Sequence, residues 1–206
     1  MEIVLYIAAG MLAVLIAVLI AVLVRVSKRT AGTEDVENRR RGRNGEELVD
    51  AILGTDEEGV RRVLTNYRFF HDGLVREVDH ILIDGRGVFV LETKNWSGKI
   101  FGRDDDDNWT QILGNDDVFH AHQNPVKQNN GHVYHLKNIL DGDMKKRIWL
   151  IPLVVFVQNN VENIESDCVV ALSVLQQKLD SYPFGQLSPQ DIEIIYQSLL
   201  SSQYKS

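Results

Sequence analysis

Residues 78–94 read VDHILIDGRGVFVLETK, and this stretch decides the fold that the sequence predicts. Residues 78–83 and 88–94 have the apolar, β-branched composition of strands. The segment Asp84-Gly85-Arg86-Gly87 between them is typical of a tight turn. We therefore expect an antiparallel hairpin over residues 78–94.

The register of this hairpin brings two acids face to face. A turn centred between residues 85 and 86 gives three opposed pairs: Ile83–Val88, Ile81–Val90 and Asp79–Glu92. Opposed residues on antiparallel strands have Cβ atoms about 4.5–5.5 Å apart. Lys94 lies two residues beyond Glu92 and therefore projects from the same face of the strand.

Asp79, Glu92 and Lys94 together provide the groups that metal-assisted hydrolysis needs. Two neighbouring carboxylates repel one another unless a cation lies between them, and hard oxygen ligands suit Mg²⁺. A bound metal stabilises charge on a phosphate, and a lysine can orient or deprotonate the attacking water. The set predicts phosphodiester hydrolysis with Mg²⁺, or with Mn²⁺ in its place.

A simpler interpretation places the same residues on a solvated face of the sheet, with Lys94 paired to Glu77 across the strands. The rest of that face is apolar, since it carries Ile81, Ile83, Val88 and Val90. A buried apolar face with charged residues at one end indicates a functional site, because burying a carboxylate without a partner costs free energy.

The remaining pattern alternates between strands and helices, which indicates an α/β domain. Helices are expected over 45–53, 126–140, 173–181 and 189–202, and strands over 109–113, 148–157 and 166–171. Residues 60–70 fit either a helical turn or an extended segment. In the first helix the expected buried stripe is Leu48, Val49, Ile52 and Leu53.

The N-terminal segment is a candidate membrane helix. Residues 3–24 contain no charged side chain, and at about 1.5 Å per residue such a helix spans roughly 33 Å, enough for a bilayer core. The run is longer than a signal-peptide core and lacks a basic region before it, which argues against cleavage. A buried core helix is the alternative interpretation.

The flanking charges predict how this segment is oriented. Arg25, Lys28 and Arg29 follow the run directly, and residues 25–41 form a linker of basic and then mixed charge. The positive-inside rule puts the N-terminus outside and the following domain in the cytoplasm, in a single-pass arrangement. Beyond residue 24 the chain carries a net charge of about −6, which argues against a non-specific nucleic-acid coat protein.

Other candidate ligands are weaker. Cys168 is the single cysteine, so neither an intrachain disulfide nor a cysteine zinc cage is expected. His120 and His122, or His132 and His135, have zinc-like spacing, but we expect ordinary surface positions for them. Residues 104–107 form an acidic run without the ordered spacing of an EF-hand calcium loop.

Several motifs in order along the chain resemble those of the nuclease-related domain (NERD) family. They are Gly42-x-x-Gly45-Glu46-x-x-Val49, Val78-Asp79-His80-Ile81-Leu82-Ile83, Gly87-Val88-Phe89-Val90-Leu91-Glu92-Thr93-Lys94-Asn95-Trp96-x-Gly98, Trp109 and Asn124-Pro125-Val126-Lys127-Gln128. The resemblance covers about residues 42–157. That family is placed in the restriction-endonuclease-like superfamily of PD-(D/E)xK nucleases.

The resemblance implies a fold and a set of site residues. The fold is a mixed sheet flanked by helices, here preceded by one transmembrane helix (1–24) and the linker (25–41). Residues 42–157 would form the core, and 158–206 a strand and helices that complete or flank it. The implied catalytic residues are Asp79, Glu92, Lys94, Glu46 and Gln128, and the implied metal ligands are Asp79, Glu92, Glu46 and Thr93.

The sequence therefore predicts a membrane-anchored, metal-dependent nuclease acting on DNA in preference to RNA. The alternative is a catalytically silent module on the same fold that binds nucleic acid or protein at the membrane. Many family members carry an N-terminal membrane segment, and nuclease activity in the family rests largely on the motif.

Overall fold

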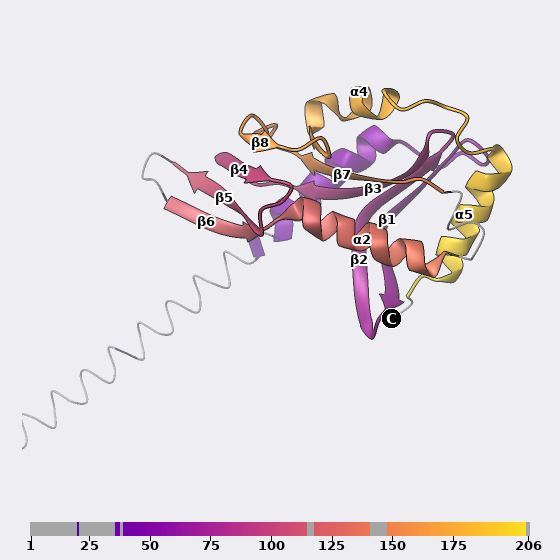
Figure 1. The fold of residues 1–206 in the computed structure, drawn as a ribbon, viewed down its shortest axis with the longest axis horizontal. Coiled ribbons are helices and arrows are strands. Elements are labelled where there is room, and N and C mark those ends of the chain that lie inside the picture. The colour runs from indigo at the N-terminus through magenta and orange to yellow at the C-terminus, as the bar shows by residue number, and fades with distance from the viewer. Residues whose placement is uncertain (1–19, 21–35, 38, 115–117, 141–147, 205–206) are drawn as a thin grey trace, which may run out of the picture. The chain divides into compact units, whose positions relative to one another are not determined.

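The computed structural model describes residues 20, 36–37, 39–114, 118–140 and 148–204. The chain divides into two units, residues 1–43 and 44–206, and the second contains all the strands labelled in Figure 1. In the first unit, residues 36–37 and 39–43 are helical. The expected membrane segment, residues 3–24, lies outside the described residues except for Ile20. Within the described part of the chain, no helix is both long and apolar enough to cross a membrane.

A five-stranded mixed sheet forms the centre of the second unit, in the order β1-β2-β3-β7-β9. The first three strands pair antiparallel, and β7 and β9 add on in parallel. The strands are β1 (Arg61–His71), β2 (Leu74–Asp84), β3 (Gly87–Lys94), β7 (Leu150–Phe156) and β9 (Val169–Ala171). The expected α/β fold with a mixed sheet is confirmed.

The hairpin predicted from residues 78–94 is β2–β3, and its register is the predicted one up to the pair His80–Leu91, whereas the predicted pair Asp79–Glu92 falls one step beyond the end of this ladder. Ile83 pairs with Val88 and Ile81 with Val90. The loop is the two-residue form, because the last pair before it is Asp84–Gly87. Residues 61–71, for which helix and strand were both open, form the long strand β1 beside this hairpin.

Helices cover both faces of this sheet (Figure 1). On one face, Ile81, Ile83, Val88 and Val90 pack with buried residues of α2 (Pro125–Ile139) and α5 (Pro189–Ser201). On the other face, alternate residues of the same strands pack with the helical residues 44–53 and with α4 (Leu175–Asp180). The two-residue period of a strand thus divides the core into two layers.

A second sheet has the order β6-β5-β4-β8. Its strands are β4 (Lys99–Arg103), β5 (Asn108–Leu113), β6 (Val118–Gln123) and β8 (Ile164–Glu165). The buried side chains of Ile100 and Trp109 join this sheet to Val154 and Phe156 of β7. β6 was missed from the sequence, because its residues FHAHQ at 119–123 lack a clean apolar alternation.

One predicted core position is wrong. Val49 and Leu53 of the first helix are buried and Ile52 is partly buried, but Leu48 is 48% exposed. An α-helix turns by about 100° per residue, so a stripe that holds Val49 and Leu53 leaves Leu48 on its flank.

Candidate active site

Asp79 lies at a break in the pairing of β2, where the β2–β3 ladder ends and the β1–β2 ladder skips one step before it continues. The β2–β3 ladder ends at the pair His80–Leu91. One step further, Oδ2 of Asp79 accepts a hydrogen bond of 2.7 Å from the Thr93 backbone N–H. On the other side, Asn66 of β1 lies opposite Asp79 with φ 50°, and the β1–β2 register skips this step. The carboxylate therefore stands where the β1–β2 ribbon leaves the sheet.

Glu92 is buried, with 3% of its surface exposed, and two polar side chains converge on one of its oxygens. Nζ of Lys94 lies 2.6 Å from Oε1 of Glu92, and the Gln128 side-chain amide donates to the same oxygen at 2.7 Å. Lys94 also donates to Oε1 of Gln128 at 3.2 Å. The resemblance named these three residues, and the structure brings them into direct contact.

His132 of α2 belongs to the same cluster and was missed. Its Nε2 lies 3.5 Å from the second Glu92 oxygen, Oε2, and this nitrogen is buried without a hydrogen-bond partner among the described residues. His132 follows Gln128 by four residues on a predicted helix. The i, i+4 spacing, which puts both side chains on one helix face, is the signal that could have found it.

The two acids at the centre have opposite pKa shifts. Burial, followed by the charge of Glu92, raises the pKa of Asp79 to about 7, against the opposing effects of the Thr93 N–H and Lys94. Burial also acts to raise the pKa of Glu92, but His132 and Lys94 outweigh it and the pKa is lowered. Glu92 is therefore the ionised member, and Asp79 holds its proton until another cation compensates its charge.

Glu46 approaches the same acids from the helix at residues 44–53. Burial raises its pKa, as do the charges of Glu77, Asp50 and Glu92, while Asn66 acts the other way. Gly45 lets the helix lie close to the sheet, since a Cβ there would be 3.1–3.4 Å from Val157, Asn95 and Thr93.

Thr93 contributes differently from the other expected ligands. A Cβ on Gly45 would lie 3.4 Å from Cγ2 of Thr93. Consecutive strand residues point to opposite faces, so the Thr93 side chain lies away from the Glu92 and Lys94 side chains. Its backbone carbonyl is thus the Thr93 oxygen suited to the acid cluster.

Asp79, Glu92 and Glu46 could together hold a divalent metal ion, although among the described residues only His71, Asp72 and His135 bring three ligand atoms within 4.8 Å of one another. Burial is the main cause of the raised pKa of Asp79 and of Glu46, and the charge of Glu92 adds to it, strongly for Asp79 and as the smallest cause for Glu46. Buried carboxylates in such a group need a compensating cation, and oxygen donors select hard ions such as Mg²⁺ and Mn²⁺.

The alternative pairing of Lys94 with Glu77 is wrong. Glu77 lies 3.5 Å from Arg68 of β1, and both side chains are about half exposed. Lys94 turns instead to Glu92 and Gln128. His80, as its alternation with Asp79 predicts, lies on the other face, where its Nε2 is 3.1 Å from Oδ1 of Asp50.

The histidine pairs do not form the sites that their spacing suggested. His122 stacks on Trp96, with ring centroids 4.3 Å apart, and its Nε2 lies 2.8 Å from Oε1 of Gln111. His132 contacts Glu92, whereas His135 faces His71 across a 2.9 Å Nδ1–Nδ1 separation. The two α2 histidines therefore belong to different clusters.

The acidic run 104–107 is occupied by internal partners. Nζ of Lys127 lies 2.7 Å from Oδ1 of Asp107, and the Arg103 backbone N–H donates to Asp106. The Asn124 amide donates to three carbonyls of this segment. The run is a turn packed against the start of α2.

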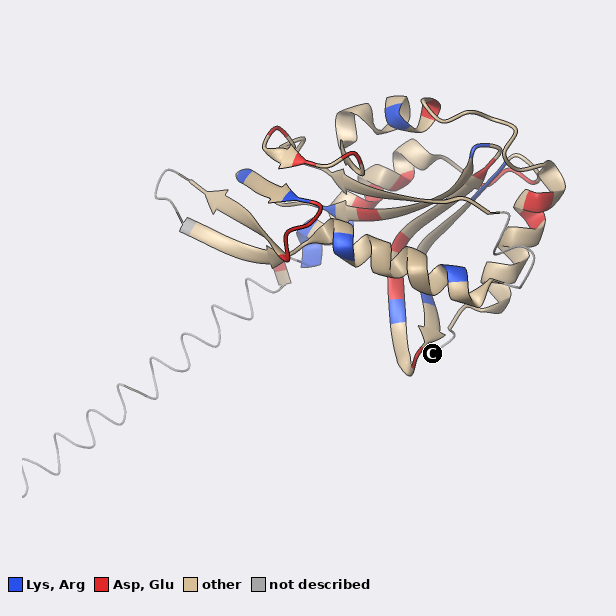
Figure 2. Cartoon of the chain, viewed as in Figure 1, with Lys and Arg blue, Asp and Glu red and all other residues tan. Residues whose placement is uncertain are grey.

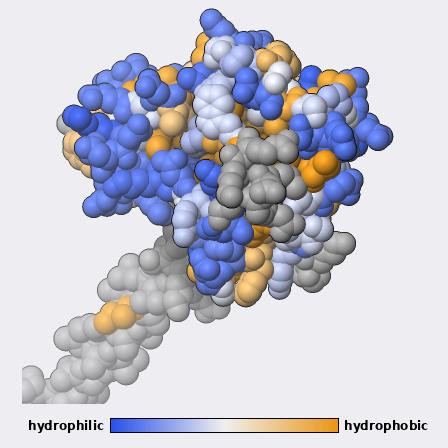
Figure 3. Space-filling view, turned by 45° about the vertical axis from the view of Figure 1, so that its right-hand side comes forward, coloured by the Kyte–Doolittle hydropathy of each residue, from blue (hydrophilic) through white to orange (hydrophobic). Residues whose placement is uncertain are grey.

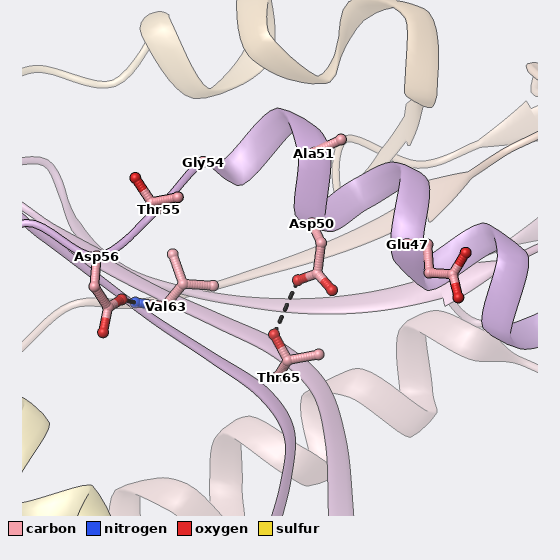
Figure 4. A pocket seen from close by; sticks show the side chains of 8 residues that line it. All are labelled: Glu47, Asp50, Ala51, Gly54, Thr55, Asp56, Val63 and Thr65. Atoms are coloured by element: carbon pink, nitrogen blue, oxygen red, sulfur yellow. Dashed lines mark hydrogen bonds between the residues drawn. The ribbon is translucent and has the colours of Figure 1, made fainter.

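A hollow of about 550 Å³ lies away from this cluster (Figure 4). It is lined by Glu47, Asp50, Ala51, Gly54, Thr55, Asp56, Val63 and Thr65. In Figure 4 the Asp50 carboxylate points toward Thr65, to which it is hydrogen-bonded at 2.9 Å. The catalytic candidates do not line this hollow.

Charge is not concentrated in one sign over the second unit. Figure 2 shows acidic positions of β2 and β3 beside α2, with basic positions spread over several elements. The face drawn in Figure 3 is mostly hydrophilic, with hydrophobic residues in small groups. Among the coloured residues of Figure 2 no continuous basic track is visible, in line with the negative charge of the chain.

The site combines an aspartate of one strand, a Glu-x-Lys on the next strand and a glutamate on the preceding helix. Set on a mixed sheet between helices, these residues are typical of a nuclease-fold domain of the restriction-endonuclease-like class. The chain belongs to the nuclease-related domain (NERD) family, whose model matches residues 41–157. A Bacillus anthracis protein described as uncharacterized is 30% identical over 164 residues, covering 78% of this chain and 76% of that protein. The comparison with solved structures found no match.

Proposed function

We propose that this protein is a metal-dependent nuclease that hydrolyses phosphodiester bonds, in DNA in preference to RNA. The observation that carries the proposal is the contact of Lys94 and Gln128 with one oxygen of buried Glu92, beside the carboxyl of Asp79. A structural role would not require an acid pair, a lysine and an amide to meet at the end of an apolar sheet face.

The groups that would hold the metal are the carboxylates of Asp79, Glu92 and Glu46 and the backbone carbonyl of Thr93. When bound, the ion supplies positive charge for the phosphate oxygens and lowers the pKa of bound water. Hydrogen bonds would orient two of these carboxylates before a metal binds, because the Thr93 N–H donates to Asp79 and the Gln128 amide donates to Glu92.

Lys94 has two uses in hydrolysis. Its ammonium, 2.6 Å from Glu92, can donate to a phosphate oxygen, and it can hold the attacking water in line. Nζ also lies 5.7 Å from the centre of the Trp96 ring, which stacks on His122. This aromatic pair is a surface on which a nucleic-acid base can stack, which supports a polynucleotide substrate.

The test is cleavage of supercoiled plasmid, single-stranded DNA and RNA by the full-length protein with Mg²⁺, Mn²⁺ or EDTA. Asp79→Asn and Lys94→Met are each expected to reduce the cleavage rate at least a hundredfold. Glu162→Gln and Lys99→Met alter exposed residues of the same types and should cleave as wild type does. Cleavage that persists in both active-site variants, or in EDTA, would overturn the proposal.

A second candidate function is a binding module that keeps the fold without turnover. The net charge of −7 argues against non-specific coating of nucleic acid, which needs a basic surface. A binding module would therefore recognise nucleic acid at a limited site. DNA binding that needs no metal, with no product after long incubation, would support this function and exclude the nuclease.

We further propose that residues 3–24 anchor the protein in a membrane, with the N-terminus outside and the nuclease domain in the cytoplasm. The uncharged run and the basic residues directly after it support this arrangement. In cells that express the full chain, the protein should sediment with membranes and resist alkaline carbonate extraction. Recovery in the soluble fraction, or digestion of the domain by protease added outside intact cells, would contradict it.

A further inference from the structure

A second cluster of ligand-type side chains lies at the tip of the β1–β2 ribbon, apart from the acids of the candidate active site. His71 is the last residue of β1, Asp72 follows it in the turn, and His135 comes from α2. Nδ1 of His71 is 2.9 Å from Nδ1 of His135 and 3.2 Å from Oδ2 of Asp72. Nδ1 of His135 is 3.8 Å from the same oxygen. Three donor atoms thus converge from two elements that are far apart in the sequence.

We propose that His71, Asp72 and His135 form a binding site for a transition-metal ion, with Zn²⁺ the best match. A tetrahedral Zn²⁺ with bonds of about 2.0–2.1 Å holds its ligand atoms roughly 3.3 Å apart. The three separations in the cluster, from 2.9 to 3.8 Å, bracket that value. Two imidazole nitrogens and one carboxylate oxygen leave the fourth position for water.

The ligand chemistry separates this site from the oxygen-rich active site. Imidazole nitrogen favours Zn²⁺ and its neighbours in the transition series, whereas carboxylate and carbonyl oxygens favour Mg²⁺. Coordination takes the neutral form of each imidazole, and the carboxylate of Asp72 would balance part of the positive charge of the ion.

A tight turn at the tip of the ribbon places Asp72 directly after His71. Asp72 and Gly73 have φ of 53° and 77°, the left-handed pair that a two-residue hairpin turn requires. The pair His71–Leu74 closes that turn. The side chains of His71 and His135 are 20% and 14% exposed, while that of Asp72 is 64% exposed. The two imidazoles are therefore mostly buried, whereas the Asp72 carboxylate is exposed, so an ion could reach the cluster from that side.

A metal here would join two elements that carry the candidate active site. The ribbon leaves the sheet at Asp79, and α2 carries Gln128 and His132, both in contact with Glu92. A metal between His71 and His135 would fasten the outer end of the ribbon to α2. Its effect on nucleolysis would be through positioning, because none of its ligands contacts Asp79 or Glu92 in the described structure.

A direct hydrogen bond between the two imidazoles explains the 2.9 Å distance equally well without a metal, with one ring donating and the other accepting. The two explanations differ in what Zn²⁺ does. A hydrogen-bonded pair gains nothing from the ion, whereas a coordination site binds one equivalent and is stabilised by it.

The experiment measures Zn²⁺ binding by calorimetry and by thermal unfolding on the full-length, chelator-treated protein, with excess Mg²⁺ present to occupy the acid cluster. Wild type is expected to bind one Zn²⁺ and to unfold at a higher temperature with it. His71→Ala and His135→Ala should each weaken binding more than tenfold and abolish the temperature shift. Co²⁺ in place of Zn²⁺ should give the visible absorption of a four-coordinate site in wild type and not in His71→Ala or His135→Ala.

Two control variants locate the ion. His120→Ala removes an exposed histidine of β6 and should bind Zn²⁺ as wild type does. Asp79→Asn impairs the proposed nuclease site and should leave Zn²⁺ binding intact, so loss of cleavage and loss of Zn²⁺ binding remain distinguishable. Equal Zn²⁺ affinity in wild type, His71→Ala and His135→Ala, or no binding in wild type, would overturn the proposal.

Discussion

Asp79 owes its chemistry to its place where the β2–β3 ladder ends and the β1–β2 ladder is interrupted. In an unbroken stretch of β2 its backbone would be paired on both sides and its side chain packed among Ile81 and Val90. At the edge of the ladder the carboxylate instead accepts from the Thr93 N–H and faces the charge of Glu92. One residue of register would move it to the opposite face of the sheet.

The raised pKa of Asp79 predicts a pH-dependent stability in the absence of metal. Its folded value of about 7 exceeds the ordinary value of 3.8, so the protonated form is favoured by folding. The contribution of Asp79 to the free energy of unfolding is therefore greatest below about pH 4 and is lost as pH rises through 7, a difference of a few kcal/mol. Asp79→Asn cannot titrate and should lose less over this range.

Urea unfolding in EDTA from pH 4 to pH 8 measures this difference. The free-energy curves of wild type and Asp79→Asn should diverge as pH rises, and Mg²⁺ should restore wild type at pH 8. Parallel curves would show that the Asp79 carboxyl is not buried beside Glu92 as described.

Gln128 is a positioning residue, because it acts through Glu92 and Lys94. Gln128→Leu keeps the volume and removes the amide that holds Oε1 of Glu92 at 2.7 Å. If the nuclease proposal holds, kcat should fall roughly ten- to a hundredfold with little change in KM, since a misplaced catalytic group affects the chemical step. Asn130→Leu changes an exposed amide of the same helix and should leave both constants unchanged. An unaltered kcat in Gln128→Leu would contradict the role.

At the scale of the element, α2 links the acidic turn to the active site. Its N-cap, Asn124, is fully buried and accepts from the backbone N–H groups of Val126 and Lys127. The same side chain donates to the carbonyls of Arg103, Asp104 and Asp106. A short Asn-Pro segment thereby sets the direction in which the helix presents Gln128 and His132.

Replacing Asn124 should reveal both functions of its side chain. Asn124→Ala loses the cap, worth about 1 kcal/mol, and leaves buried carbonyls without donors, so a total loss of about 2–4 kcal/mol is expected. Asn124→Asp keeps the cap acceptor but loses the amide donor, and it should be destabilised by the donor contribution alone. Chemical denaturation of the two variants measures both terms. Equal stability of Asn124→Asp and wild type would show that the three carbonyl contacts contribute nothing.

At the scale of the whole molecule, the second unit contains its own core. Buried clusters lie on both faces of the five-stranded sheet and at its junction with the second sheet. All the candidate catalytic residues belong to this unit, residues 44–206. We therefore expect the domain to fold without the N-terminal apolar run.

A chain that begins at Val36 tests this independence. It should be soluble without detergent, have an unfolding temperature within about 3 °C of that of the full chain, and keep any cleavage activity in solution. Scanning calorimetry and the plasmid assay measure these properties. Failure of the shortened chain to unfold cooperatively would show that residues 1–35 contribute to the core.

The sequence by itself determined the β2–β3 hairpin, its register and the common face of Asp79, Glu92 and Lys94. It could do so because a tight turn and a two-residue period are local properties of the chain. Only the tertiary structure decided which side chains from elsewhere meet these residues. Contacts of His132 with Glu92 and of His135 with His71 join positions 40 and 64 residues apart, and their formation depends on how α2 packs across the sheet. The strand β6 and the partner of Lys94 likewise depend on packing between elements that are distant in the sequence.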